Sequence, residues 1–368
     1  IQNGDHLSLA LMTIQKNGDS RKSVIINNHS KYTSYTLIET LHGFVENINV
    51  LDFDGDGDLD MFFIVKDSNS ELISNYTKPY LFINKNDKFI NVNENLNMID
   101  LSKTIKHALW SDMDNNGYQD LIYTQNFGTI KIYLNLGGKL ELHQGINNLN
   151  NICARWSSLE VGDLNGDGLL DILAGNMGNN NLITFSKDNI TKVIYSTYEN
   201  NIKVPFTFVK SSIDVHYRPM DNYFYYLKNV INFIDIFPNI HSFANANYDD
   251  LAKLLKDTTE KKIINQSKSI ILFNNGINFE IREFNNEIQS GAINSFVLDN
   301  YTDDQYQDIL VDLNLYNLSN DWLKVTNFNK YLTQLNTQGS YQFSNVFNNL
   351  ISLVNYGDCI YYADIYNN

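Results

Sequence analysis

Short apolar runs recur along the chain, each directly after a segment rich in Asp, Asn and Gly. They read MFFIV at 61–65, LIYT at 121–124 and ILAG at 172–175. Near-continuous apolar runs of this length are typical of strands whose sheet is covered on both faces. The pattern therefore predicts short strands in sheets that are stacked between neighbouring sheets.

The polar segments before these strands are copies of one nine-residue loop, DFDGDGDLD at 52–60, DMDNNGYQD at 112–120 and DLNGDGLLD at 163–171. Each copy has oxygen-bearing side chains at positions 1, 3, 5 and 9 and Gly at position 6. A weaker copy between Asn300 and Asp308 has Thr302 at position 3 and Gln305 at position 6. The stretch NGDHLSLAL from Asn3 resembles the second half of such a loop.

A second repeated element is an apolar strand, an Asn, a short turn and another apolar strand. Its Asn residues are Asn27, Asn84, Asn135, Asn274 and Asn336. The first four precede the next loop by 25 to 28 residues. This constant spacing predicts that each hairpin forms one rigid unit with the loop that follows it.

The period of the loops predicts a β-propeller. The loops begin 60 and 51 residues apart, and repeats of about 50 residues with several short strands fit four-stranded blades. The longer gap between Asp163 and Asn300 predicts a hidden repeat around Lys210 to Asp214, with its hairpin displaced to Asn274. Adding a terminal strand pair within 349–368 gives six or seven blades, and seven are expected in a single domain over residues 1–368.

Residues 220–257 differ from the rest because their apolar and aromatic residues have helical spacing. We expect two helices separated by Pro238, with Asn247 or Asp249 as the N-cap of the second. This helical insertion either packs over one face of the propeller as a cap, the favoured interpretation, or presents a docking surface.

The oxygen pattern of the loops indicates calcium. Side chains at positions 1, 3, 5 and 9 and the carbonyl of position 7 supply the six or seven oxygens that Ca²⁺ prefers, whereas Mg²⁺ requires a tighter octahedron. An EF-hand needs Glu at position 12, where this chain has Phe63, Tyr123 and Ala174. Single clusters of this composition are usually plain turns, but three copies in one register favour cation loops.

About three Ca²⁺ sites are therefore expected, with a fourth near Asn300–Asp308. The expected ligands are Asp52, Asp54, Asp56, Asp60 and the carbonyl of Asp58; Asp112, Asp114, Asn116, Asp120 and the carbonyl of Tyr118; and Asp163, Asn165, Asp167, Asp171 and the carbonyl of Leu169.

Charge and composition exclude several classes of function. The 368 residues include 27 basic and 42 acidic ones, a net charge of −15 that disfavours binding to nucleic acid or anionic lipid. No apolar run of about 18 residues is present, so no transmembrane segment is expected. The two cysteines, Cys153 and Cys359, allow at most one disulfide and no zinc cluster.

No catalytic constellation is visible. The sequence has no GxSxG, HExxH or Walker motif, and none of its seven His lies at metal-ligand spacing to another. His107 with Trp110, and Arg155 with Trp156, precede two of the loops; we expect packing between blades, with a rim pocket as the alternative. His216, Tyr217 and Arg218 form a second candidate cluster. A non-enzymatic protein is expected, although some sugar-binding or polysaccharide-lyase propellers also carry calcium, and that alternative stays open.

The loops, the period and the Asn hairpins resemble the FG-GAP, or VCBS, repeats of integrin alpha-chain propellers and many bacterial surface proteins. Residues 156–180 and the helical insertion resemble in particular the CRTAC-type VCBS-repeat proteins of Bacteroidetes. This resemblance implies an exported, outer-membrane-associated protein of which the chain is one propeller. It implies a binding or adhesion scaffold whose partner is a protein or a cell-surface glycan, within an envelope complex.

Structural calcium points to the same location without reference to a family. A divalent ion neutralises the carboxylates that crowd each loop, and its binding energy becomes folding energy. Calcium at the millimolar concentration found outside cells saturates weak modules of this kind, whereas cytosolic calcium usually does not. An extracellular or cell-surface location is therefore expected.

Overall fold

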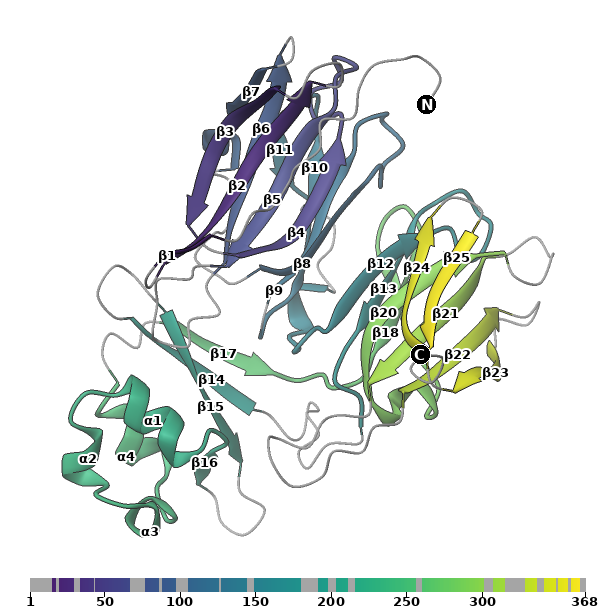
Figure 1. Cartoon of the computed structure of the whole chain (residues 1–368). Helices are drawn as coiled ribbons and strands as arrows, with labels where there is room; N and C mark the ends of the chain where they lie inside the picture. The colour runs from purple at the N-terminus through teal and green to yellow at the C-terminus, as the bar shows by residue number, and fades with distance from the viewer. Residues whose placement is uncertain are drawn as a thin grey trace.

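The computed structural model consists mainly of antiparallel strands (Figure 1). It describes residues 15–17, 20–29, 34–42, 44–66, 77–85, 88–96, 105–125, 127–143, 149–179, 191–197, 203–210, 216–255, 260–300, 307–314, 328–335, 341–348, 350–356 and 359–364. Side chains are described for most of these residues between 45 and 313. The loop expected near the N-terminus, the turn after Asn336 and most of the fourth cation loop lie outside the described residues.

The described residues form seven sheets, of which six follow one another along the chain. Sheet I contains β1 (Gln15–Asn17), β2 (Ser20–His29) and β3 (Ser34–His42). Sheet II contains β4 (Phe44–Leu51), β5 (Asp60–Lys66), β6 (Thr77–Lys85) and β7 (Lys88–Asn91). Sheet III contains β8 (Ile105–Ser111), β9 (Asp120–Gln125), β10 (Ile130–Asn135) and β11 (Leu140–Leu142).

The second half of the chain forms the other three. Sheet IV contains β12 (Ser158–Gly162), β13 (Asp171–Gly175), β18 (Ile270–Asn274) and β19 (Phe279–Glu283). Sheet V contains β20 (Ala292–Asp299), β21 (Asp308–Asn314), β22 (Phe328–Leu335) and β23 (Tyr341–Asn348). Sheet VI is the predicted terminal pair, β24 (Leu350–Tyr356) and β25 (Cys359–Asp364). In the described part of the chain, short 3₁₀ turns lie at Asn93–Leu96, Leu149–Asn151 and Ile288–Ser290.

The sheets pack in chain order through their early strands. Strand β2 contacts β4, β4 contacts β8, β8 contacts β12, β12 contacts β20 and β20 contacts β24. Successive four-stranded antiparallel sheets packed in this way are consistent with the blades of a β-propeller. The number of blades and the closure of the ring stay predictions.

Burial on both faces of the sheets is confirmed. In β5, Phe62 and Ile64 belong to the core shared with sheet III, whereas Phe63 lies in a cluster on the opposite face. In β13, Ile172 joins the core shared with sheet III and Leu173 the core shared with sheet V. Each of these apolar runs therefore contributes alternate side chains to two different cores, which explains why it lacks polar positions.

Both tryptophans before the loops pack between sheets, as expected. Trp110 of β8 makes edge-to-face contacts with Phe53 and Phe62 of sheet II, at centroid distances of 5.8 and 5.3 Å. Trp156 is 1% exposed and lies in the core between sheets III and IV, where its Nε1 donates to the Gly128 carbonyl at 2.9 Å.

The expected hidden blade is wrong, because the segment around Lys210 belongs to an insertion within sheet IV. Between β13 and β18 the chain forms a separate sheet with strand order β16-β15-β14-β17. Its strands are β14 (Thr191–Thr197), β15 (Lys203–Lys210), β16 (Tyr217–Pro219) and β17 (Glu260–Ile264). The insertion therefore contains a whole sheet as well as the predicted helices.

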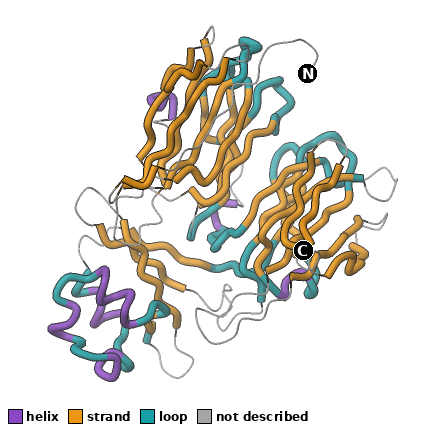
Figure 2. The backbone as a smooth tube through the Cα atoms, viewed as in Figure 1, coloured by secondary structure: helices purple, strands orange, loops and turns teal. Residues whose placement is uncertain are grey.

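Four short helices lie between β16 and β17: α1 (Tyr223–Asn229), α2 (Phe233–Ile236), α3 (Ile240–Phe243) and α4 (Tyr248–Ala252). Asn247 is the predicted N-cap: its Oδ1 accepts from the backbone N–H groups of Asp249 and Asp250. The helices share a core with Phe206 and Phe208 of β15. Figure 2 shows the helices next to the strands of the insertion. They pack on their own sheet rather than, as predicted, over a propeller face.

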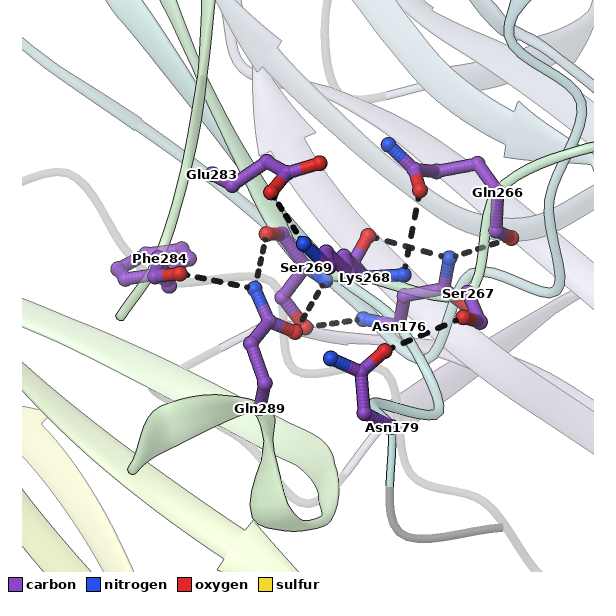
Figure 3. A network of polar contacts seen from close by, with 9 residues as sticks. All are labelled: Asn176, Asn179, Gln266, Ser267, Lys268, Ser269, Glu283, Phe284 and Gln289. Atoms are coloured by element: carbon purple, nitrogen blue, oxygen red, sulfur yellow. Dashed lines mark hydrogen bonds and ion pairs between the residues drawn. The ribbon is translucent and has the colours of Figure 1, made fainter. Parts of the chain in front are cut away.

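A polar network closes the base of the insertion (Figure 3). Buried Asn176, just after β13, donates from Nδ2 to the carbonyls of Gln266 and Lys268 at 3.0 and 3.3 Å. Gln289 accepts from the Ser269 N–H at 2.9 Å and donates back to the Ser269 carbonyl at 2.8 Å. The chain thus leaves and re-enters sheet IV at one point, so β18 pairs with β13 as if the insertion were absent.

Candidate metal centre

Each acidic loop connects the first two strands of its sheet. Residues 52–60 join β4 to β5, residues 112–120 join β8 to β9, and residues 163–171 join β12 to β13. The structure therefore places the three predicted loops at equivalent positions in sheets II, III and IV.

The carboxylate at position 1 shapes the loop by accepting backbone N–H groups. Asp52 accepts from Gly55 at Oδ1 and from Gly57 at Oδ2, at 2.8 and 3.0 Å. Both glycines have positive φ, 76° and 91°, a conformation that residues with a Cβ rarely adopt. Asp112 and Asp163 make the equivalent bonds to Gly117 and Gly168, at 2.8 and 2.9 Å. The loop curls around its first residue, which turns the carboxylates at positions 3 and 5 toward it.

The carboxylate at position 9 ties the loop to its sheet. Fully buried Asp60 accepts from the Phe53 N–H at Oδ2 and from the Asn84 N–H at Oδ1, at 2.8 and 2.7 Å. Asp120 accepts in the same way from Met113 and Asn135, at 2.8 and 2.7 Å. Each position-9 side chain thereby joins three parts of one sheet: the loop start, the second strand and the hairpin after the third.

Burial raises the pKa of these position-9 carboxyl groups. The pKa of Asp60 and that of Asp120 rise to about 6, and that of Asp171 rises to about 7. Their backbone donors oppose the rise, and the other carboxylates of each loop add to it. Negative charge in the loops is therefore costly when nothing positive compensates it.

The first two loops gather carboxylates at one point. Oxygens of Asp52, Asp54 and Asp56 lie within 4.8 Å of one another. Oxygens of Asp112, Asp114 and Asp120 do the same. Asp54 Oδ1 is buried and has no hydrogen-bond partner, and burial, followed by the charge of Asp56, raises the pKa of Asp54. A buried acceptor oxygen among other carboxylates fits a divalent cation.

The third loop brings its carboxylates less close together. It has an amide at position 3, Asn165, whose Nδ2 donates to Asp167 Oδ2 at 2.9 Å. Its carboxylates Asp163, Asp167 and Asp171 do not gather as closely as those of the first two loops. Coordination of a cation by any of the predicted ligands stays a prediction, and Asp60, Asp171 and the carbonyls of Asp58, Tyr118 and Leu169 are not among the residues whose carboxylates gather.

The hairpin Asn residues serve a different loop from the one expected. Asn84, Asn135 and Asn274 each belong to the sheet of the preceding acidic loop, where the backbone N–H of the Asn donates to the position-9 carboxylate. Asn135 also donates from Nδ2 to the Phe53 carbonyl of the previous loop at 2.8 Å. The number of residues from position 9 to the Asn is 24, 15 and 103 in the three sheets, so this partnership has no constant spacing to reveal it.

Neighbouring loops also touch one another. The Tyr118 ring lies so close over Gly55 that a Cβ added there would be 2.4 Å from Tyr118 Cε1. Asn115 Nδ2 donates to the Gly168 carbonyl at 3.4 Å. The sequence singled out Tyr118 for its carbonyl, and the structure adds this contact of its side chain between two loops.

The other candidate residues have structural surroundings. Burial, with a contribution from Lys106, lowers the pKa of His107 to about 4, so its imidazole is neutral at physiological pH. Arg155 lies over the Phe127 ring at 5.7 Å. Tyr217 stacks against the Lys192 ammonium at 3.7 Å, and Arg218 Nη1 donates to the Asn245 carbonyl at 2.7 Å. The last two contacts lie within the insertion: the first joins β14 to β16, and the second joins β16 to the segment between α3 and α4.

Comparison with known proteins agrees with this geometry. Among the described residues, no helix has the length and apolar character needed to cross a membrane. No curated protein matches the chain. Residues 112–174, which span the second and third acidic loops, match the FG-GAP-like repeat, and this repeat indicates a β-propeller scaffold of the binding or adhesion type.

Proposed function

We propose that the protein is a calcium-stabilised β-propeller that acts, without catalysing a reaction, as an extracellular or cell-envelope scaffold for protein binding or adhesion. The observation that carries the proposal is the shared geometry of three acidic loops, two of which bring three carboxylates within 4.8 Å. The FG-GAP-like repeat over two of these loops supports it.

Calcium fits this donor set better than other common cations. The side chains are all oxygen donors, and Asp54 keeps a buried oxygen without a hydrogen bond. Ca²⁺ accepts six to eight oxygens in flexible geometry, whereas Mg²⁺ retains water and needs a tight octahedron. The ligands expected to hold it in the first loop are Asp52, Asp54 and Asp56, with Asp60 and the Asp58 carbonyl completing the set. When bound, the ion supplies the positive charge that the loop lacks.

An extracellular or envelope location follows from the strength expected of such sites. All three loops are exposed at positions 4 to 6. Exposed loops of this type correspond to weak calcium modules, which are saturated at roughly millimolar calcium outside cells. Attachment to a bacterial outer membrane is also proposed, and its sole support is the resemblance to CRTAC-type proteins.

A protein partner is favoured over a glycan by the surface of the insertion. Between Met220 and Ile240, large apolar side chains such as Phe224 and Ile231 are 64% and 58% exposed. Broad apolar surface of this kind marks protein interfaces. Recognition or cleavage of carbohydrate is the alternative function of the same fold.

Thermal unfolding with and without excess EDTA tests the proposal. We expect removal of calcium to lower Tm by several degrees or more, and calcium but not magnesium to restore it at millimolar concentration. An unchanged Tm would show that the loops are plain turns and would overturn both the calcium assignment and the location inferred from it.

A further inference from the structure

The helices of the insertion expose an unusual amount of apolar surface. Seven of the sixteen large hydrophobic side chains that the structure describes as exposed lie within 220–240. We call these seven the apolar face: Met220, Phe224, Leu227, Ile231, Ile234, Ile236 and Ile240, with exposed fractions of 38% to 64%. Scattered exposed hydrophobics are ordinary on a protein surface, but such a concentration marks an interaction site.

Helix α1 has two apolar sides, and only one of them is covered. Tyr223, Tyr226 and Val230 are buried in the core that the helices share with β14 and β15. Within α1, Phe224 and Leu227 are exposed and lie three residues apart, which places them on the other side. Met220 lies just before the helix and Ile231 just after its C-cap, Val230, and both are exposed as well.

The apolar face has the size of one half of a protein interface. Seven large side chains at these exposures present several hundred Å² of apolar surface, on the order of the ~800 Å² that each partner contributes to a standard interface. The face lies on the insertion, outside the six sheets that pack in series (Figure 1). A partner can therefore bind there without disturbing the packing between those sheets.

The charges of the apolar face are self-complementary. Between Met220 and Ile240 the chain has one exposed cation, Lys228, and one exposed anion, Asp235; the remaining charged residue, Asp221, is less exposed and accepts from the Thr207 N–H. Ile231 lies between Lys228 and Asp235 in the sequence. In an interface with two-fold symmetry, every contact between two different residues occurs twice, once in each direction. Lys228 of each copy can therefore face Asp235 of the other copy. The face then carries no net charge, although the chain carries −15.

We infer that the apolar face binds a second copy of this chain and forms a two-fold symmetric dimer. The inference deepens the proposed function and rests on it in one respect, because the same surface favours a protein partner there; the inference names that partner as a second copy. A lipid bilayer fits less well, because the net charge of −15 repels anionic headgroups and Asp235 would have to enter the interface beside Ile234 and Ile236.

Sedimentation of the full chain in calcium, over a concentration series reaching about 100 µM, tests the dimer. We expect a monomer–dimer equilibrium for the unchanged chain. Replacing both Phe224→Ser and Ile231→Ser should weaken the dimer at least tenfold. The matched control is Ile277→Ser, which removes a still more exposed Ile, at 78%, from the hairpin between β18 and β19. Circular dichroism checks that each variant keeps its fold.

Charge reversal tests the symmetric pairing. Lys228→Asp alone and Asp235→Lys alone should each weaken self-association. An equimolar mixture of the two variants should form a heterodimer, because each Asp then faces a Lys. A mixture that stays monomeric would contradict the pairing.

Two further results would overturn the inference. One is an unchanged chain that stays monomeric throughout the series; the other is a dimer that the Phe224 and Ile231 changes leave intact. Binding of the monomer to phosphatidylcholine vesicles would assign the apolar face to a lipid surface instead. None of these results alters the effect of EDTA on Tm, so a failure here is distinguishable from a failure of the proposed function.

Discussion

Asp171 accepts a hydrogen bond at Oδ1 from the backbone N–H of Asn274, at 2.8 Å and across 103 residues of sequence. The same bond joins Asp60 to Asn84 in sheet II and Asp120 to Asn135 in sheet III. The insertion therefore leaves the internal bonding of sheet IV intact. The position-9 carboxylate is the common structural element of these sheets, whether or not the loop binds a cation.

Replacing Asp171→Ala should destabilise the protein by about 2–4 kcal/mol, because it leaves the N–H groups of Leu164 and Asn274 without their acceptor. Denaturant unfolding in EDTA measures this cost apart from any cation. The control Glu94→Gln changes an exposed carboxylate outside the loops and should stay within about 0.5 kcal/mol of the unchanged chain. Equal effects of the two changes would mean that the Asp171 bonds contribute nothing.

The two glycines of the first loop should respond differently to a methyl group. Gly55→Ala and Gly57→Ala both place a Cβ at positive φ, at a cost of about 1 kcal/mol or more. At Gly57 the space is open, but at Gly55 the new Cβ meets the Tyr118 ring at 2.4 Å. Gly55→Ala should therefore cost more, and adding Tyr118→Ala should recover part of the difference. A double-mutant cycle measures that coupling, and additive effects would contradict a contact between the loops.

Within the first loop, Asp54→Asn should weaken calcium binding more than it changes the stability of the calcium-free protein. Asp54 Oδ1 is buried without a hydrogen bond. Because burial, followed by the charge of Asp56, raises the pKa of Asp54 against the opposing effects of the Asp56 backbone and Lys85, the neutral amide should leave Tm in EDTA unchanged or higher. The rise of Tm on adding calcium should become smaller. Glu94→Gln again serves as control, and an unchanged calcium response in Asp54→Asn would exclude Asp54 as a ligand.

How far the sequence predicts this protein depends on whether a feature is local. The loops, the flanking strands and the N-cap at Asn247 depend on neighbouring residues, and the structure has them where the sequence predicts them. The apolar run from Met61 to Val65 also indicates burial on both faces, because no polar position interrupts it.

The errors concern pairings between distant residues. The region around Lys210 has strand character, but its sequence does not say that β14 pairs with both β15 and β17 while β13 pairs with β18. The Asn hairpins are assigned to the wrong loop because the constant spacing of 25 to 28 residues measures the connection to the next sheet. The bond to the position-9 carboxylate depends on which strands pair. The number of residues between the paired strands differs from sheet to sheet.

His107 should make the protein less stable in mild acid. Its imidazole is buried beside the Ser157 backbone, and burial holds the pKa of His107 at about 4 in the folded chain against an ordinary value of 6.5. Above pH 6.5 the ring is neutral in both states and stability is fully present. As the pH falls from 6.5 toward 4, the unfolded chain takes up the proton first, so stability is lost by at most about 1.4 kcal/mol per pH unit.

Replacing His107→Gln, which cannot take up this proton, should flatten the decline of stability between pH 6.5 and 4.5, measured by urea unfolding in saturating calcium. The matched control is His143→Gln, a histidine just after β11 whose side chain is half-buried. The buried position-9 carboxyl groups act in the opposite direction, because their raised pKa values favour the folded state as pH falls. They are unchanged in both variants, so the difference between the two pH profiles isolates His107. Identical profiles would show that His107 is protonated equally in the folded and unfolded chain.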